Sequence, residues 1–287
     1  MDDPQKAIVR PTSSLENLIQ AVFPIMEKIM PSVARNFAVT LFIRPFRFPY
    51  KPEEEQFMET CERFKFTIGG VEHHGFKKGS GPAVLCVHGW SGRSTQFRFM
   101  APKLIEAGYT FVTFDALAHG RTEGKKATLF DFAQAIKHLL SAHNDVRAVI
   151  GHSLGAASVS YAISEGAHVP AFIAMGAPVV GEDILNEFCN RLNGSPKIKD
   201  AIRARSREEF GIMFDEVLME KTFSKVTCPV LGIHGKLDVD APPHGLDVLK
   251  QIRPDMDTLL LPNMGHRRIL KEDPALALVV NWLRDLK

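Results

Sequence analysis

The chain has 287 residues, and its 45% hydrophobic content is enough for one large core, or for one core with a small insertion. The 35 lysines and arginines nearly balance the 33 aspartates and glutamates, and a formal charge of +2 argues against nucleic acid as a partner. The opening Met-Asp-Asp-Pro predicts no secretory signal, and no stretch approaches the roughly 20 apolar residues of a membrane span.

Residues 1–60 are predicted to form an N-terminal helical arm and a linker. The apolar stretch 15–43 is typical of helices that pack on the body of the protein or on a second copy in a homodimer. The other interpretation is an amphipathic anchor at a membrane surface. We favour packing and do not expect surface association, because Pro24 and Pro31 should break a long amphipathic helix and Glu27 interrupts the apolar run.

The main domain is predicted at residues 61–287, after a solvated linker at 51–55. Strand and helix patterns then alternate, which predicts an α/β fold with a mostly parallel, doubly wound sheet. Residues 63–68 and 71–76 flank Gly69-Gly70 as an antiparallel hairpin. Further strands are expected at 83–88, 110–114, 146–150, 170–175, 227–235 and 258–262, and helices near 95–107 and 128–142.

A sharp turn is predicted at Gly151-His152-Ser153-Leu154-Gly155, between the strand pattern of 146–150 and the helix pattern of 156–162. A serine with small residues at plus and minus two is the sequence form of a nucleophile elbow. Such a turn exposes the Ser153 hydroxyl beside a helix N-terminus, where the Leu154 N–H can bind an oxyanion. Ser153 is therefore the predicted nucleophile.

Two further residues complete a catalytic triad in the order serine, acid, histidine. Asp238 follows the strand pattern of 227–235, and His266 lies in the loop after the last strand. Because the carboxyl ends of parallel strands meet at one edge of a sheet, both side chains should lie near Ser153. Asp240 is the alternative acid, although we favour Asp238.

A second oxyanion donor is expected from the loop after the strand at 83–88. There the chain reads His88-Gly89-Trp90-Ser91-Gly92, and its glycines let the Trp90 N–H turn toward the nucleophile. The Trp90 side chain itself fits either a pocket wall or the core. The remaining histidines of these motifs are expected to brace turns: His88, His119, His152 and His234.

Taken in order, His88-Gly89, the elbow at 151–155, Asp238-x-x-Ala-Pro and Gly265-His266 resemble the motif set of the α/β-hydrolase superfamily. The resemblance spans roughly residues 62–287. It implies the sheet described above, with a triad of Ser153, Asp238 and His266 and no metal or organic cofactor.

Residues 115–122 also resemble a turn of this superfamily, with Ala118 in place of the usual glycine. The superfamily's substrate-selecting cap is implied at about 178–224, where the alternation of strands and helices breaks. A small helical cap is therefore expected. The candidates to line the acyl pocket are Trp90, Phe188, Phe210, Met213, Phe214 and Met219.

These residues predict a serine hydrolase, carboxylesterase-like, that cleaves carboxylic esters or thioesters through an acyl-enzyme. Perhydrolysis or aminopeptidase activity on the same triad stays open, as does a non-catalytic ligand-binding homologue. An aminopeptidase needs cap carboxylates that hold the substrate ammonium. The candidates for that role are Glu182, Asp183, Glu187, Glu208 and Glu209.

The four cysteines show no metal-ligand spacing, and two of them fall in core-strand patterns. We therefore expect reduced thiols in a cytoplasmic protein whose partner is a small-molecule ester. The cysteines are Cys61, Cys86, Cys189 and Cys228.

Overall fold

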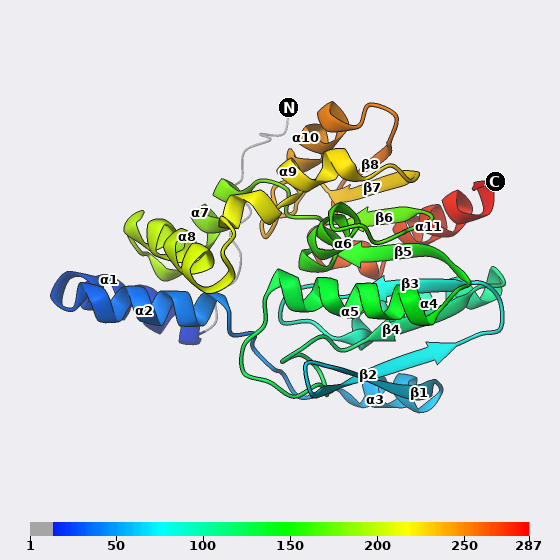
Figure 1. Cartoon of the computed structure of the whole chain (residues 1–287), viewed down its shortest axis with the longest axis horizontal. Helices are drawn as coiled ribbons and strands as arrows, with labels where there is room; N and C mark the ends of the chain where they lie inside the picture. The colour runs from blue at the N-terminus through cyan, green and yellow to red at the C-terminus, as the bar shows by residue number, and fades with distance from the viewer. Residues whose placement is uncertain (1–13, 287) are drawn as a thin grey trace.

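A computed structural model describes residues 14–286 and shows an eight-stranded sheet with helices on both faces (Figure 1). The strands are β1 (Glu62–Ile68), β2 (Val71–Lys78), β3 (Ala83–Val87), β4 (Thr110–Phe114), β5 (Val146–His152), β6 (Phe172–Met175), β7 (Val230–Gly235) and β8 (Asp257–Leu261). The α-helices are α1 (Ser14–Ile29), α2 (Pro31–Phe42), α3 (Pro52–Glu59), α4 (Met100–Glu106), α5 (Leu129–Ala142), α6 (Leu154–Ser164), α7 (Gly181–Leu192), α8 (Lys197–Phe210), α9 (Met219–Thr222), α10 (Gly245–Ile252) and α11 (Asp273–Asp285). Short 3-10 helices are η1 (Ser94–Phe97), η2 (Phe214–Val217), η3 (Phe223–Lys225) and η4 (Arg268–Leu270).

The sheet has the strand order β1-β2-β4-β3-β5-β6-β7-β8 and is mostly parallel. Only the pairs β1–β2 and β2–β4 are antiparallel, and the other pairs run parallel. Gly69 and Gly70 form the β1–β2 turn with φ of 56° and 81°, in the left-handed region that favours glycine. The predicted α/β class and the antiparallel hairpin are therefore confirmed.

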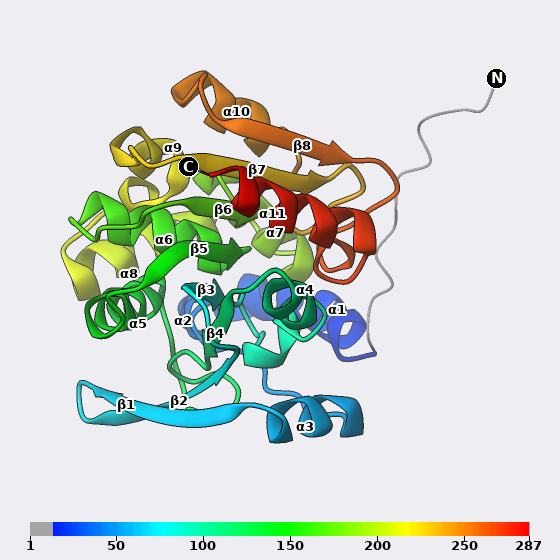
Figure 2. The same ribbon diagram turned by 90° about the vertical axis from the view of Figure 1, so that its right-hand side faces the viewer.

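Two apolar layers cover the sheet, with α5 and α6 on one side and α4 and α11 on the other (Figure 2). Side chains of β5 pack into both layers. Val149 packs into the layer of α5 and α6, while Ala148 and Ile150 pack into the opposite layer. A central parallel strand is buried on both faces, which is why this part of the sequence is a continuous apolar run.

The linker predicted at 51–55 is wrong, because this segment begins helix α3. Glu54 is buried, and its carboxylate pairs with Arg93 at 2.7 Å and accepts a hydrogen bond from Thr95 Oγ1 at 2.6 Å. A run of three acids suggested solvent, but the middle one is neutralised by partners about forty positions away in the chain. The pair attaches α3 to the loop that carries η1.

The two prolines of the arm have different effects. Pro24 lies inside α1 without ending it, whereas Pro31 is the first residue of α2. The expectation that both break the helix is therefore wrong for Pro24. The arm is a pair of helices with one break.

The helices α1 and α2 pack on α7 and α8, which lie between β6 and β7 (Figure 1). Phe23, Ala34 and Ala38 of the arm share a buried cluster with Leu185 and Ile198. The four helices form one lobe beyond the carboxyl ends of the parallel strands. Among the described helices, none combines the length and the hydropathy needed to cross a bilayer.

Candidate active site

Ser153 lies at the junction of β5 and α6 with φ 54° and ψ −126°, a strained conformation for a residue with a side chain. Its N–H donates to the carbonyl of Met175 in the neighbouring strand at 3.0 Å. A Cβ at Gly151 would lie 2.5 Å from the Cα of Ala156, and one at Gly155 would lie 2.3 Å from the carbonyl oxygen of Val87. The turn therefore requires glycine on both sides of the serine, as expected of a nucleophile elbow.

Asp238 is buried and pairs with the partly exposed His266, whose Nδ1 lies 2.8 Å from Asp238 Oδ2. The other carboxylate oxygen accepts the backbone N–H groups of Asp240 and Ala241 at 3.0 and 2.9 Å. Burial alone would raise the pKa of Asp238, but the hydrogen bonds from His234 and His266 hold it well below its usual range. The Asp238 carboxylate thus stays ionised. Because it contacts Nδ1 of His266, the other ring nitrogen, Nε2, can face a substrate.

His234 also contacts the Asp238 carboxylate, and the sequence did not predict this contact. Its Nε2 lies 3.1 Å from Asp238 Oδ2 and 2.9 Å from the carbonyl oxygen of Ala241. The sequence predicts that His234 braces a turn, and its bond to the Ala241 carbonyl fits that role. Its position four residues before Asp238, where β7 ends and the chain turns, was the available signal.

The elbow and the histidine loop are joined by His152, whose Nε2 donates to the carbonyl of His266 at 2.9 Å. A Cβ placed on Gly176, directly after β6, would lie 3.3 Å from His266 Nδ1 and 3.4 Å from an Asp238 oxygen. Gly176 directly follows Met175, whose carbonyl accepts the N–H of Ser153. The three predicted triad residues therefore lie at one edge of the sheet. The Ser153 hydroxyl makes no hydrogen bond to another described residue, and such contacts often tighten only when substrate binds.

The Gly89-Trp90 peptide is held in one orientation. The Gly89 carbonyl accepts the Nδ1–H of His88 at 2.8 Å and the N–H of Gly92 at 3.0 Å. Because the peptide is trans, the Trp90 N–H points away from these donors. A Cβ on Gly89 would lie 2.8 Å from the Cβ of Ser153, so this peptide lies against the nucleophile.

The other expected oxyanion donor is the N–H of Leu154, the first residue of α6. First-turn N–H groups have no acceptor within their helix, and they lie at the positive end of its dipole. The Leu154 and Trp90 amides are thus available to bind a developing oxyanion near Ser153.

Three buried histidines support these loops in the neutral form. Burial lowers the pKa of His88 to about 4, and burial together with the neighbouring ring of His88 lowers that of His119 to about 3. His119 Nε2 accepts the N–H of Ser91 at 3.1 Å, directly after Trp90. Burial, together with the nearby His266, lowers the pKa of His152 to about 3. Each of these three rings braces a turn, as the sequence predicted.

Asp240, the alternative acid, has another role. Its carboxylate binds Arg191 of α7 at 2.6 Å and so ties the β7 loop to the lobe of helices. Asp238, Asp240 and His266 offer three ligand atoms within 4.8 Å of one another. Those atoms already serve the Asp238–His266 and Asp240–Arg191 pairs, so we do not propose a metal site here.

The expected pocket residues lie in and around the lobe. Phe188 and Phe214 pack edge-on against Phe42 of α2, with ring centroids 5.0 and 5.7 Å away. Phe210 contacts Phe130 at 5.0 Å. Met213 is half-buried, Met219 is fully buried in the core, and the Trp90 ring packs edge-on against His119.

Two surface hollows, of about 470 and 440 Å³, are lined mainly by residues of β1, β2 and the adjoining turns. Neither includes a residue of the expected triad. They are separate from the candidate site.

Residues 82–190 match a protein family described as the alpha/beta hydrolase fold. The matched segment, the sheet and the elbow are those of the alpha/beta hydrolase fold. A 90-residue stretch is 33% identical to an uncharacterised protein of Mycobacterium tuberculosis strain H37Rv. That stretch covers 29% of this chain and 26% of the mycobacterial protein, so the match spans about a quarter of the relative's length.

Solved structures share the fold at low sequence identity. A membrane phospholipase A, described as a bacterial virulence factor, superposes with a TM-score of 0.62 at 14% identity over 94% of this chain and 97% of its own. The Pyrococcus furiosus esterase Pf2001 gives 0.62 at 19% identity over 84% and 96% of the two chains. A thioesterase domain from the curacin biosynthetic pathway gives 0.58 at 17% identity over 78% and 99%.

Proposed function

We propose that this protein is a serine hydrolase that cleaves carboxylic esters or thioesters through an acyl-enzyme on Ser153. The observation that carries the proposal is the pairing of the buried Asp238 with His266 at 2.8 Å, at the same sheet edge as a serine in a strained elbow. This arrangement supplies a nucleophile, a base and a group that orients the base. An esterase, a thioesterase domain and a phospholipase among the structural neighbours fit the same acyl chemistry.

In the proposed reaction, His266 takes the proton of Ser153 as the serine oxygen attacks the acyl carbonyl. Asp238 holds the ring with its Nδ1 protonated and stabilises the imidazolium. The amides of Trp90 and Leu154 donate to the oxyanion of the tetrahedral intermediate. His266 then gives the proton to the leaving alcohol or thiol, and it activates water for deacylation.

The cap gives no support to an aminopeptidase. Of the five cap carboxylates that could hold a substrate ammonium, three are paired with a lysine or arginine of the protein itself, and a fourth contacts a histidine. Glu182 binds Lys199 and Arg203, and Asp183 binds His244. Glu187 binds Arg191, and Glu209 binds Arg205. An amine substrate would have to displace these partners, whereas an uncharged acyl ester would not.

A reducing compartment, the cytoplasm, is part of the proposal, because all four cysteines are unpaired. The substrate is proposed to be a small-molecule ester that needs no metal and no organic cofactor.

A panel of p-nitrophenyl esters of increasing acyl length, with thioester and aminoacyl-amide counterparts, tests the proposal. We expect turnover of esters or thioesters, and a loss of about 10⁴-fold or more in Ser153→Ala and in His266→Ala. Circular dichroism should show both variants folded. Turnover of amides alone would favour the aminopeptidase, and no turnover of any member would favour a ligand-binding homologue.

A further inference from the structure

The outer face of the arm carries large apolar side chains that solvent reaches. Leu18, Val22, Ile25 and Ile29 form one stripe along α1, and Val33 and Phe37 continue it on α2; their exposed fractions lie between 43% and 70%. The opposite face of the same helices packs against the lobe. We name these six residues the outer arm face. A contiguous group of this kind marks an interaction surface, whereas single exposed apolar residues do not.

The exposed charged residues of this segment have one sign, while the partly buried Glu16 and Glu27 are acidic. Between residues 16 and 49, every exposed residue is neutral or basic, and the exposed cations are Lys28, Arg44 and Arg47. Glu27 lies on the inner side, where its carboxylate accepts the N–H of Ser195 at 2.9 Å and also the Ser195 hydroxyl. The acid that interrupts the apolar run in the sequence is therefore absent from the outer arm face.

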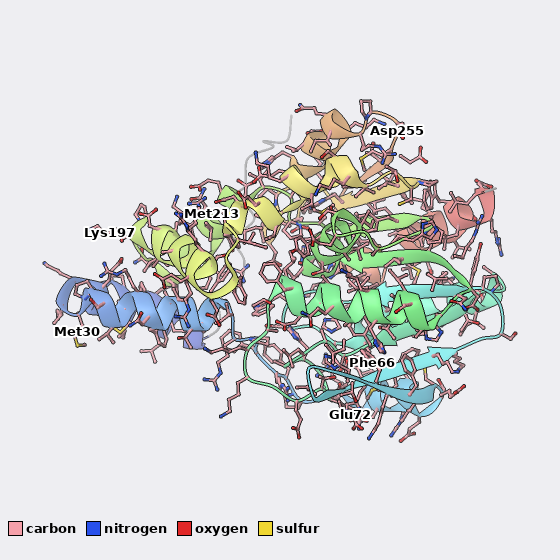
Figure 3. All side chains as sticks on the ribbon, viewed as in Figure 1. Met30, Phe66, Glu72, Lys197, Met213 and Asp255 are labelled. Carbon is pink, nitrogen blue, oxygen red and sulfur yellow. The ribbon has the colours of Figure 1, made fainter. Side chains whose placement is uncertain are left out.

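The outer arm face lies at an outer end of the molecule, and Figure 3 shows Met30, between α1 and α2, far from the sheet. The chain then leads from α2 to the candidate site. The N–H of Phe46 donates to Ser91 Oγ at 2.9 Å, directly after the proposed oxyanion donor Trp90. Phe46 and Phe48 are both exposed, so the apolar surface continues toward the catalytic edge.

Although the sequence alone favours packing of the arm over surface association, we propose that the outer arm face docks on a membrane surface that contains anionic phospholipids, with α1 and α2 lying in the headgroup region. The apolar stripe supplies burial in the acyl boundary, and Lys28 and Arg44 supply attraction to the headgroups. A second copy of the chain fits less well, since pairing two such faces brings like charges together. This binding goes beyond the proposed hydrolysis and does not depend on Ser153.

Vesicle flotation with the full chain tests the proposal, using Ser153→Ala so that no lipid is consumed. Vesicles of phosphatidylcholine with phosphatidylglycerol are compared with phosphatidylcholine alone. We expect binding to the mixed vesicles that weakens as salt increases. Ile25→Gln with Ile29→Gln should weaken it about tenfold or more, and Lys28→Gln with Arg44→Gln by about fivefold per charge.

The matched control is Leu260→Gln with Leu278→Gln, which makes the same kind of change at exposed apolar residues of the main domain. This control should bind like the parent protein, and all variants should keep their melting temperature. Equal binding of the Ile25/Ile29 variant and the control would overturn the proposal. So would a dimer in sedimentation velocity that the Ile25/Ile29 variant dissociates, in a protein that does not float with vesicles.

Discussion

Nε2 of His234 lies 3.1 Å from Oδ2 of Asp238, the same oxygen that His266 Nδ1 approaches at 2.8 Å. With the amides of Asp240 and Ala241 on the other oxygen, both sides of the carboxylate are occupied. Rotation of Asp238 would break several of these bonds at once. His234 is therefore a positioning residue for the proposed acid of the triad.

Replacing His234 by leucine removes one donor to a buried carboxylate. Hydrogen bonds to charged groups contribute about 1.5–3 kcal/mol, so kcat should fall by roughly 10- to 100-fold with little change in KM. His234→Gln keeps an N–H donor and should recover part of the loss. Steady-state kinetics on a p-nitrophenyl ester, with urea unfolding of both variants, measures this. Equal rates for the two variants would show that the donor is unimportant.

Substitutions of Asp238 and Asp240 should have clearly different effects on kcat. Asp238→Asn permits the wrong tautomer of His266 and should lower kcat by about 10⁴-fold. Asp240→Asn loses the pairing with Arg191 but no bond to His266, so activity should change by less than about threefold. The comparison is made by kcat on one ester under identical conditions. The reverse pattern would assign the acid role to Asp240.

Stability should fall as the pH decreases below about 6.5, the ordinary pKa of histidine. His88, His119 and His152 have lowered pKa values in the folded state, so in this range the unfolded chain binds protons that the folded chain does not. Their contribution is complete above the unfolded pKa and is lost as the pH falls toward about 4 for His88 and about 3 for His119 and His152. Each histidine contributes a slope of about 1.4 kcal/mol per pH unit well below pH 6.5.

Urea unfolding from about pH 7.5 to about pH 5 measures this dependence. His119→Gln keeps an acceptor for the N–H of Ser91. It should reduce the slope of the unfolding free energy against pH by the contribution of one histidine. A free energy of unfolding that stays constant over this range would contradict the assignment of neutral buried rings.

Deleting residues 1–50 should destabilise the protein. The deletion removes Phe23, Ala34 and Ala38 and uncovers the apolar side of α7 and α8, at a cost of roughly 25 cal/mol per Å² of exposed apolar surface. We expect a lower melting temperature and aggregation, measured by calorimetry and light scattering. A monomeric truncated chain as stable as the full protein would show that the arm does not support the lobe.

The parts of the structure that the sequence predicted depend on local patterns. The strands, the Gly69-Gly70 turn and the elbow around Ser153 each follow from neighbouring residues. The parts that it missed depend on distant partners. Glu54 is buried because Arg93 neutralises it, and Glu27 faces inward because Ser195 donates to it.

Ala118, which stands where the superfamily's turn usually has glycine, is a further feature that the sequence alone did not explain. Ala118 adopts φ 61°, which explains why glycine is usual at this position of the superfamily's turn. The sequence identified the substitution, but only the structure shows the strain that the alanine tolerates.

We propose that Ser153 is a nucleophile activated by His266. This proposal is tested most directly by a fluorophosphonate probe followed by peptide mass spectrometry. We expect a single covalent adduct on Ser153, no adduct in Ser153→Ala, and labelling slowed by orders of magnitude in folded His266→Ala. An adduct on a different serine, or equal labelling rates with and without His266, would contradict it.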